Sequence, residues 1–319
     1  MRFTSPILRT TNRVQIDCRM GEAKRNPSFL GAVSRAPRTR AFRQWSEVTD
    51  KISPHAQRWL TAFLIGLPTL FILAAGPSWT WLLLVALVAT AGLWEINGLL
   101  FEEPLPAKWR VLFFFGGLLL PFGAWLGDLP GLAVALALAV FSSFALLLVT
   151  TPLAAAALTR IALINFAWLY IPFTLSFVIA IGYLPLGRLW IIFTLLVVIA
   201  EDACAFYSGM RFGKTKLYEI ISPKKSVEGA FGGLAAGVFL GLAYGFFALR
   251  GVSAFKLAGI AILLCIAGQT GDLIESMIKR NSGKKDSSHL LPGHGGMLDR
   301  LDSLLFAFPL SYFLLKWFV

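Results

Sequence analysis

Apolar runs of membrane-spanning length recur along this chain of 319 residues. A helix needs about 20 apolar residues to cross roughly 30 Å of hydrocarbon, and helices satisfy their backbone hydrogen bonds within one segment in lipid. The chain is 57% apolar and 14% charged, whereas a soluble domain carries about 25% charged residues. We therefore predict an all-α, polytopic integral membrane protein with about nine transmembrane helices, at residues 60–76, 79–101, 111–127, 129–150, 161–182, 189–208, 230–249, 254–278 and 303–319.

The first part of the chain differs from the rest in charge. Residues 1–58 hold twelve Lys or Arg against four acidic residues. Such a segment is typical of a disordered arm near anionic lipid headgroups, and an Arg-rich organelle-targeting peptide is the alternative. We expect a basic, disordered cytoplasmic tail at residues 1–57 and a transmembrane domain at residues 58–319.

The remaining cations indicate an orientation, because short cytoplasmic loops are enriched in Lys and Arg. With the tail in the cytoplasm, two charge-rich loops, 209–229 and 279–302, lie on the cytoplasmic side, while the opposite loops hold only Arg188, Arg250 and Lys256. We expect a multi-pass protein of the cell inner (cytoplasmic) membrane, with its N-terminus and active site on the cytoplasmic face.

Glycine recurs at every fourth position of the run at 230–249 and just before it. Small residues at this spacing let helix backbones approach closely, so we expect a packing role. The stripe permits a homodimer without requiring one; its members are Gly229, Gly233, Gly237, Gly241 and Gly245.

Glu201 and Asp202 lie at the end of an apolar run. An ionised carboxylate at mid-bilayer costs about 3 kcal/mol unless it is paired or holds a cation. For Asp202 a functional role is favoured over a neutral, hydrogen-bonded acid, and for Glu201 both interpretations stay open.

The loop at 209–229 contains two candidate phosphate-binding segments. Gly209 to Thr215 is not a P-loop, because three residues instead of four separate its glycines and it follows a membrane helix. Ser222, Lys224 and Lys225 come just before a helix, where backbone amides and ammonium groups attract phosphate. A basic cytoplasmic loop without a ligand is the alternative.

The last charged loop joins two groups of acidic residues. Two carboxylates three residues apart lie just before the run at 303–319, where the last helix begins. At the end of the preceding run, four polar residues at spacings of three and four share one helical face. A short loop brings both groups together, where they could hold one divalent cation. Magnesium accepts such oxygen ligands, with substrate phosphates completing its shell. The residues are Asp272, Glu275, Ser276 and Lys279, then Asp299 and Asp302. For His294, backbone organisation or a phosphate contact is favoured over metal ligation.

One mixed pattern in this loop resembles the signature of the phosphatidate cytidylyltransferases, also called CDP-diglyceride synthases. It consists of Ser276, Lys279, Arg280, Lys285, Asp286, Leu291, Pro292, His294, Gly295, Gly296, Asp299, Arg300 and Asp302. The resemblance continues upstream to Asp202 and covers about residues 58–319. Two positions depart from the family pattern: Ser226-Val227 stands where Thr-Trp is common, and Glu201 replaces a less acidic residue. They concern substrate detail.

The resemblance implies a polytopic helical enzyme that joins CTP to phosphatidic acid, giving CDP-diacylglycerol and pyrophosphate. It implies magnesium, with Asp272 and Asp299 as ligands. Positioning and charge neutralisation should supply most of the catalysis. We expect CTP, phosphatidic acid and membrane lipids as partners, and no nucleic acid.

The residue roles follow from that reaction. We assign catalysis to Asp272, Asp299, Lys279, Arg280 and Asp302, and substrate binding to Ser222, Lys224, Lys225, Asp202, Lys285, His294 and Arg300. A CTP-dependent lipid kinase, or a cytidylyltransferase for another lipid phosphate, is the alternative. A membrane transporter is less favoured, because its acids would lie near mid-membrane and these gather toward one face.

Overall fold

The computed structural model describes residues 54–150, 155–288, 290 and 295–319. The expected tail at residues 1–57 falls almost wholly outside the described residues, as does His294. The first described helix, α2, begins at Pro54.

Helices account for most of the described residues. Their order, with one short antiparallel hairpin, is α2 (Pro54–Ala75), α3 (Ser78–Leu100), α4 (Ala107–Thr150), α5 (Ala155–Trp168), η1 (Leu169–Phe173), α6 (Thr174–Gly182), α7 (Gly187–Phe212), β1 (Lys216–Tyr218), β2 (Ser222–Ser226), α8 (Val227–Ala248), α9 (Ala254–Asn281) and α10 (Leu298–Phe318). The segment η1 has π-helical hydrogen bonding around Pro172 and continues α5 into α6. The predicted polytopic, helical membrane fold is confirmed.

Seven segments within the described residues are long and apolar enough to cross a membrane, and one of them, α4, consists of two helices joined at a kink. Two of the expected runs, 111–127 and 129–150, lie in the single 44-residue segment α4. The expected run at 60–76 lies in α2, whose described apolar part is the shorter Gly66–Ala75. The other six runs each correspond to one of the remaining candidate spans.

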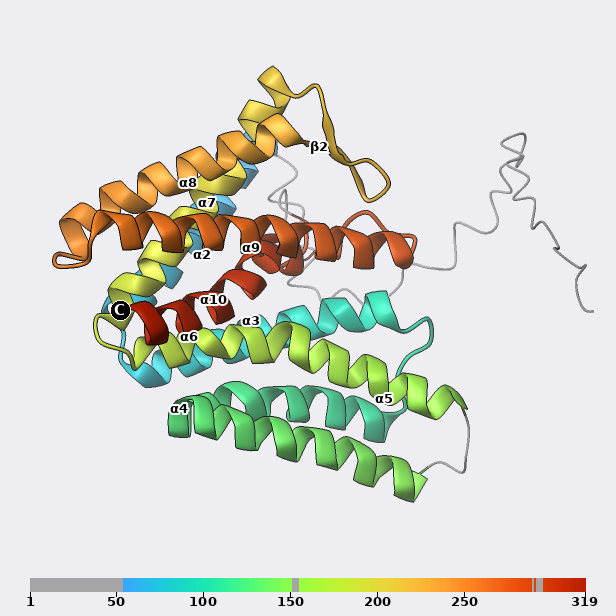
Figure 1. Ribbon diagram of the computed structural model, residues 1–319. Helices are drawn as coiled ribbons and strands as arrows, with labels where there is room; N and C mark the ends of the chain where they lie inside the picture. Colours follow the sequence, from blue (N-terminus) through green and yellow to red (C-terminus); the bar gives the residue numbers. More distant parts are fainter. Residues whose placement is uncertain (1–53, 151–154, 289, 291–294) are drawn as a thin grey trace, which may run out of the picture. The chain divides into compact units, whose positions relative to one another are not determined.

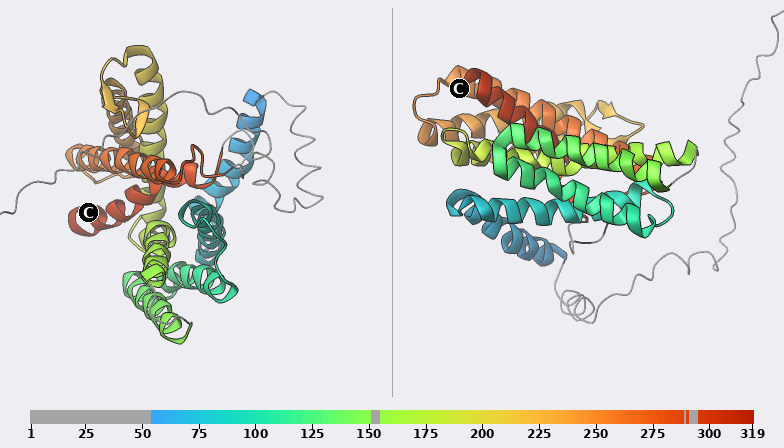
Figure 2. Two further views of the ribbon diagram at one scale, coloured as in Figure 1. Left: turned by 90° about the vertical axis from the view of Figure 1, so that its right-hand side faces the viewer. Right: turned by 90° about the horizontal axis from the view of Figure 1, so that it is seen from below.

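The segment α4 reverses direction in its middle. Gly127 and Asp128 have non-helical backbone angles, and Asp128 has a φ of 54°. A Cβ atom built on Gly123 would lie 2.5 Å from Cβ of Ala135, so the two halves pack against each other. Figures 1 and 2 show them as neighbouring helices.

The glycine stripe of α8 packs against α7 and α9. All five glycines are buried. A Cβ atom on Gly233 would lie 2.6 Å from the carbonyl oxygen of Glu201, and one on Gly237 would lie 3.0 Å from that of Val197. The expected packing role is confirmed. The close approach of the two backbones places Glu201 and Asp202 of α7 beside the first two turns of α8.

The hairpin β1–β2 was not expected, because its residues read as a basic loop. It pairs Lys216 with Ser226 and Tyr218 with Ser222. The first turn of α8 anchors it: the Glu228 carboxylate accepts hydrogen bonds from the N–H groups of Lys214 at 3.0 Å and Thr215 at 3.1 Å. These hydrogen bonds hold the segment that follows α7 against the first turn of α8.

Cations lie beside carbonyl groups at helix ends, where they complement the helix dipole. At one end of the helices, Arg188 donates hydrogen bonds to the carbonyls of Ala74 and Gly76, and Lys256 donates to Phe318. Lys284, in the loop after α9, donates to Gly98 near the end of α3 at 2.6 Å. The α9–α10 loop and the end of α3 therefore share one end of the molecule's described helices.

Candidate active site

A pocket of about 580 Å³ lies between the end of α7, the hairpin, the start of α8 and α9. This volume suits a small-molecule ligand. Its polar wall contains the acids Glu201, Asp202 and Asp272 and the cations Lys216, Lys224 and Lys225. Two exposed apolar side chains, Phe206 and Met210, also line it.

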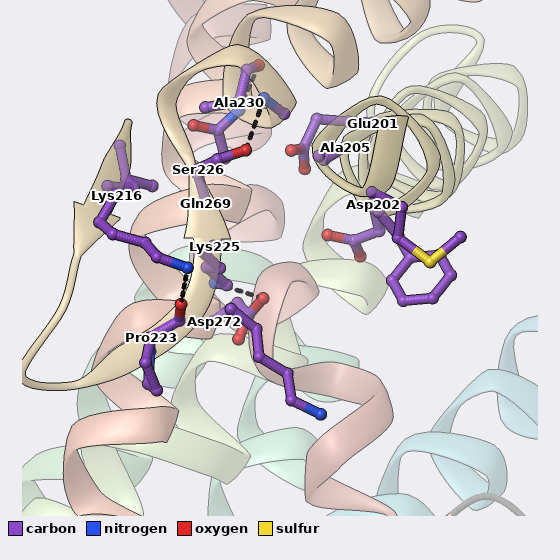
Figure 3. A pocket seen from close by; sticks show the side chains of 16 residues that line it. Glu201, Asp202, Ala205, Lys216, Pro223, Lys225, Ser226, Ala230, Gln269 and Asp272 are labelled. Atoms are coloured by element: carbon purple, nitrogen blue, oxygen red, sulfur yellow. Dashed lines mark hydrogen bonds and ion pairs between the residues drawn. The ribbon is translucent and has the colours of Figure 1, made fainter. Parts of the chain in front are cut away.

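An ion pair between Lys225 and Asp272 joins the hairpin to α9 at this pocket (Figure 3). Both side chains keep about a quarter of their surface exposed, 26% and 29% respectively. The Ser276 hydroxyl, one turn further along α9, lies 3.4 Å from Oδ1 of Asp272 and donates to it. A cation and a carboxylate thus stand together at a site that a ligand can reach.

Acidic side chains from three helices meet beside this ion pair. Asp202 of α7 accepts a hydrogen bond from the Ser303 hydroxyl of α10 at 3.2 Å. Asp302 lies close enough to Asp272, Glu275 and Asp202 to interact with them electrostatically. The neighbouring Glu201 is 1% exposed, and its Oε2 has no hydrogen-bond partner among the described residues. The cluster would favour a cation.

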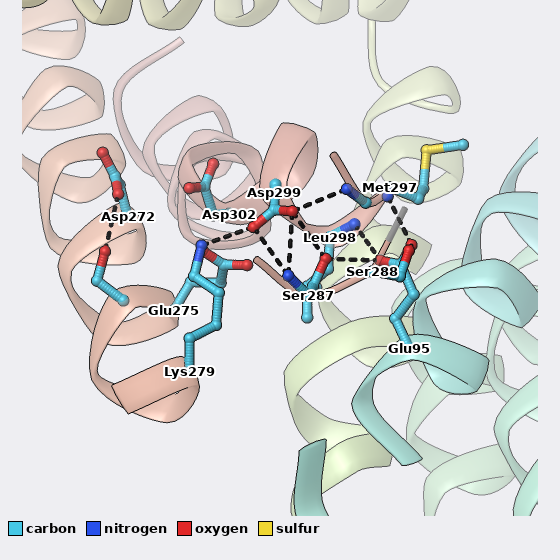
Figure 4. A network of polar contacts seen from close by, with 12 residues as sticks. Glu95, Asp272, Glu275, Lys279, Ser287, Ser288, Met297, Leu298, Asp299 and Asp302 are labelled. Atoms are coloured by element: carbon cyan, nitrogen blue, oxygen red, sulfur yellow. Dashed lines mark hydrogen bonds and ion pairs between the residues drawn. The ribbon is translucent and has the colours of Figure 1, made fainter. Parts of the chain in front are cut away.

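Lys279 joins α9 to the start of α10 (Figure 4). Its Nζ lies 2.6 Å from Oδ1 of Asp299 and also pairs with the fully buried Glu275. The Asp299 carboxylate accepts further hydrogen bonds from the Gly296 N–H at 2.8 Å and the Ser287 hydroxyl at 3.0 Å. These contacts fix the Asp299 side chain at the first turn of α10.

The predicted site residues fall into two connected groups and several outliers. Asp202, Lys224, Lys225 and Asp272 line the pocket. Lys279 and Asp299 form the adjoining group, and Asp302 lies beside Asp272. Ser222 is the first residue of β2. Three further cations are exposed near the end of α9 and the start of α10, namely Arg280, Lys285 and Arg300. The Arg280 guanidinium reaches the Ile221 carbonyl at 3.5 Å. His294 lies outside the described residues.

Several polar residues of the site escaped prediction. Gln269 lines the pocket and donates to the Ala230 carbonyl at 3.0 Å, and Ser287 and Ser303 contact the acids. Glu95 of α3 contacts the α9–α10 loop. Its signal was available: it is the one ionisable side chain in the run from Ser78 to Leu100, and such residues in membrane helices are usually functional.

The donor atoms fit magnesium, which takes hard oxygen ligands. Among the described residues, no group of three or more His, Cys, Asp or Glu has the geometry of a metal site. Magnesium is usually held by one or two carboxylates together with substrate phosphates, so a dedicated cage is not required. Asp272 forms an ion pair with Lys225, and Asp299 forms one with Lys279. Both carboxylates therefore stabilise a positive charge in this structure.

The fold and the site define a polytopic helical membrane protein with an acid- and lysine-lined pocket at one end of its helices. Within that class, residues 56–318 match the model of the cytidylyltransferase family, and the chain belongs to this family.

The chain is also similar to named bacterial proteins. It is 38% identical over 160 residues to the phosphatidate cytidylyltransferase of Bacillus subtilis (strain 168); the alignment covers 50% of this chain and 60% of the relative. It is 40% identical over 129 residues to the phosphatidate cytidylyltransferase of Staphylococcus aureus (strain COL), covering 40% of this chain and 50% of the relative. The chain thus aligns with between half and three fifths of the length of these relatives.

Proposed function

We propose that this protein transfers the CMP group of CTP to phosphatidic acid, giving CDP-diacylglycerol and pyrophosphate. The observation that carries the proposal is the pocket at the Lys225–Asp272 ion pair. It combines cations suited to a triphosphate, acids suited to a metal, and exposed apolar side chains suited to a lipid. The family and the names of the relatives support the same reaction.

The reaction forms one bond and breaks one. An ionised phosphate oxygen of phosphatidic acid attacks the α-phosphorus of CTP, and the bond from that phosphorus to the bridging oxygen breaks. Pyrophosphate leaves with the electron pair. Because the attacking oxygen is already ionised, positioning and charge neutralisation replace a general base.

The cations of the site hold the phosphates in this scheme. Lys224 and Lys225 line the pocket and would bind the triphosphate. Lys279, Arg280 and Arg300 lie at the adjoining helix ends and would receive the departing pyrophosphate. Ser222, Lys285 and His294 complete the proposed substrate-binding set.

Asp272 and Asp299 would hold magnesium, with Asp302 and Asp202 nearby. When bound, the metal would neutralise charge on the nucleotide phosphates. The carboxylates themselves, fixed by Ser276 and by Ser287 and Gly296, would supply a preset position for that charge.

The lipid substrate would enter sideways from the membrane. Phe206 and Met210 line the pocket and are 61% and 68% exposed, so acyl chains could stay in hydrocarbon while the phosphate reaches Lys225. By the positive-inside rule this face would lie in the cytoplasm, where CTP is available.

Replacing either proposed metal ligand tests the assignment. Asp272→Asn and Asp299→Asn should each lower CTP-dependent conversion of phosphatidic acid by about 100-fold or more, because each removes a negative charge from the site. The measurement is liponucleotide formation by purified protein in detergent, with and without magnesium. Glu219→Gln, an exposed acid in the hairpin, is the matched control and should keep wild-type turnover.

Robust turnover in either variant, with unchanged membrane insertion, would refute the metal-ligand roles. The alternative lipid kinase is distinguished by its products, because a kinase releases CDP and phosphorylates an alcohol. A cytidylyltransferase for another lipid phosphate would leave phosphatidic acid unreacted.

A further inference from the structure

Glu95 lies near the end of α3 and reaches the start of α10 (Figure 4). Its side chain is 2% exposed. One carboxylate oxygen accepts hydrogen bonds from the Met297 N–H at 2.8 Å and the Ser288 hydroxyl at 2.5 Å. The other accepts from the Leu298 N–H at 2.7 Å and the Ser287 hydroxyl at 3.1 Å. Four donors thus converge on this one side chain, two at each carboxylate oxygen.

The contact supplies a helix cap from a different helix. The first N–H groups of any helix lack intrahelical partners, and Met297, which precedes α10, makes no side-chain cap. A carboxylate at this position also complements the positive end of the helix dipole. Glu95 therefore fixes where α10 begins and how the preceding loop approaches it.

Two features connect Glu95 to Asp299. The Ser287 hydroxyl lies 3.1 Å from Oε2 of Glu95 and 3.0 Å from Oδ2 of Asp299; it has one proton and can donate to one carboxylate at a time. Gly296 contacts both acids: its N–H donates to Oδ2 of Asp299 at 2.8 Å, and a Cβ atom built on it would clash with Oγ of Ser287 and lie 2.7 Å from Oε1 of Glu95. A larger residue at this position would therefore displace the Ser287 and Glu95 side chains.

We infer that Glu95 is a positioning residue for the reaction: it clamps the end of the α9–α10 loop so that Asp299 stands opposite Lys279. Glu95 does not line the pocket, so its effect must pass through the loop and the first turn of α10. The kinetic part of this inference rests on the proposed function, whereas the structural part does not.

Glu95→Gln tests the clamp while preserving side-chain size. The glutamine side chain has one acceptor oxygen, and its NH2 group would face one of the two backbone N–H groups that Glu95 accepts from. The backbone amide protons of Met297 and Leu298 should therefore exchange with solvent at least about tenfold faster. Exchange in α8 should not change. With Asp299 displaced, kcat should fall at least about tenfold, while KM for phosphatidic acid stays within about twofold because the pocket is intact.

Glu103→Gln is the matched control, since Glu103 is an exposed acid just beyond the same helix; both readouts should stay at wild-type values. A Glu95→Gln protein with wild-type kcat and wild-type exchange at Met297 and Leu298 overturns the inference. Loss of protection throughout the chain also overturns it, because that result indicates a general structural role.

Ser288→Ala provides a second test if Glu95→Gln does not insert into the membrane. It removes one of the four donors and should lower kcat about two- to fivefold, with faster exchange confined to Ser287, Ser288 and residues 295–298. Unchanged kcat and exchange in this variant contradict the clamp. If the wild-type protein makes no liponucleotide, the proposed function fails, and the exchange measurements still decide whether Glu95 holds the loop.

Discussion

Two lysines at the site form ion pairs with neighbouring carboxylates. Lys225 faces Asp272, and Lys279 faces Asp299 and Glu275. Burying a charge without a partner is costly, and the buried Glu275 has Lys279, one turn away on α9, as its ion-pair partner. The Lys225–Asp272 pair, in contrast, is partly exposed at the pocket. A substrate phosphate could therefore replace Asp272 as the partner of the Lys225 ammonium.

Lys225→Met should weaken the handling of CTP more than that of the lipid. A hydrogen bond to a charged group contributes about 1.5–3 kcal/mol, which corresponds to about 10- to 100-fold in kcat/KM for CTP. Lys214→Met is the control, because Lys214 is an exposed lysine next to β1 that does not line the pocket. Equal losses in the two variants, measured by initial rates at varied CTP, would show that only overall positive charge matters.

At the level of elements, the packing of α8 against its neighbours positions the pocket. Gly237 lies between α7 and α9, and a Cβ atom there would be 2.5 Å from Sγ of Cys265 and 3.0 Å from the Val197 carbonyl oxygen. The hairpin is joined to the start of α8, where Ser226 caps the helix by accepting from the Gly229 N–H at 3.1 Å and Glu228 accepts from the Lys214 N–H at 3.0 Å.

Gly237→Ala should therefore destabilise the protein by about 1–3 kcal/mol through overpacking. Gly259→Ala, in the neighbouring helix α9, is the matched control: a Cβ atom there meets nothing within 4 Å, and the higher helix propensity of alanine should stabilise by up to about 1 kcal/mol. Thermal unfolding in detergent compares the two variants, and shifts of the same sign would contradict the packing role of the α8 glycines.

The elements also show what sequence patterns can and cannot predict. Hydropathy located the helices, because each spanning run is apolar along its length, and spacing located the α8 glycines. The reversal at Gly127 and Asp128 falls between the two expected spans at 111–127 and 129–150. The hairpin depends on Glu228 accepting N–H groups from residues 13 and 14 positions earlier. Neither these contacts nor that of Glu95 with Leu298, 203 positions apart, has a local sequence signature.

For the whole molecule, the charged loops share one end of the described helices. Lys225–Asp272 and Lys284–Gly98 connect the hairpin, α9, the α9–α10 loop and α3, while Arg188 and Lys256 lie at the opposite ends of their helices. This arrangement agrees with the division of cations between the two sides that the positive-inside rule requires.

Cysteine labelling tests the orientation. After replacement of Cys18, Cys204 and Cys265 by alanine, Asp286→Cys and Arg250→Cys should react with a membrane-impermeant maleimide from opposite sides of sealed vesicles. Asp286 follows α9 and Arg250 follows α8, and both are exposed. We expect Asp286→Cys to label from the cytoplasmic side. Labelling of both positions from one side would contradict the proposed topology.

The proposed transfer itself is tested most directly by following two phosphates of CTP in one reaction. CTP carrying different labels on its α- and γ-phosphorus is incubated with phosphatidic acid, magnesium and the purified full-length protein. The α-label should enter the lipid together with cytidine, and the γ-label should leave as pyrophosphate. Transfer of the γ-label to lipid, with the α-label left in CDP, would contradict the account.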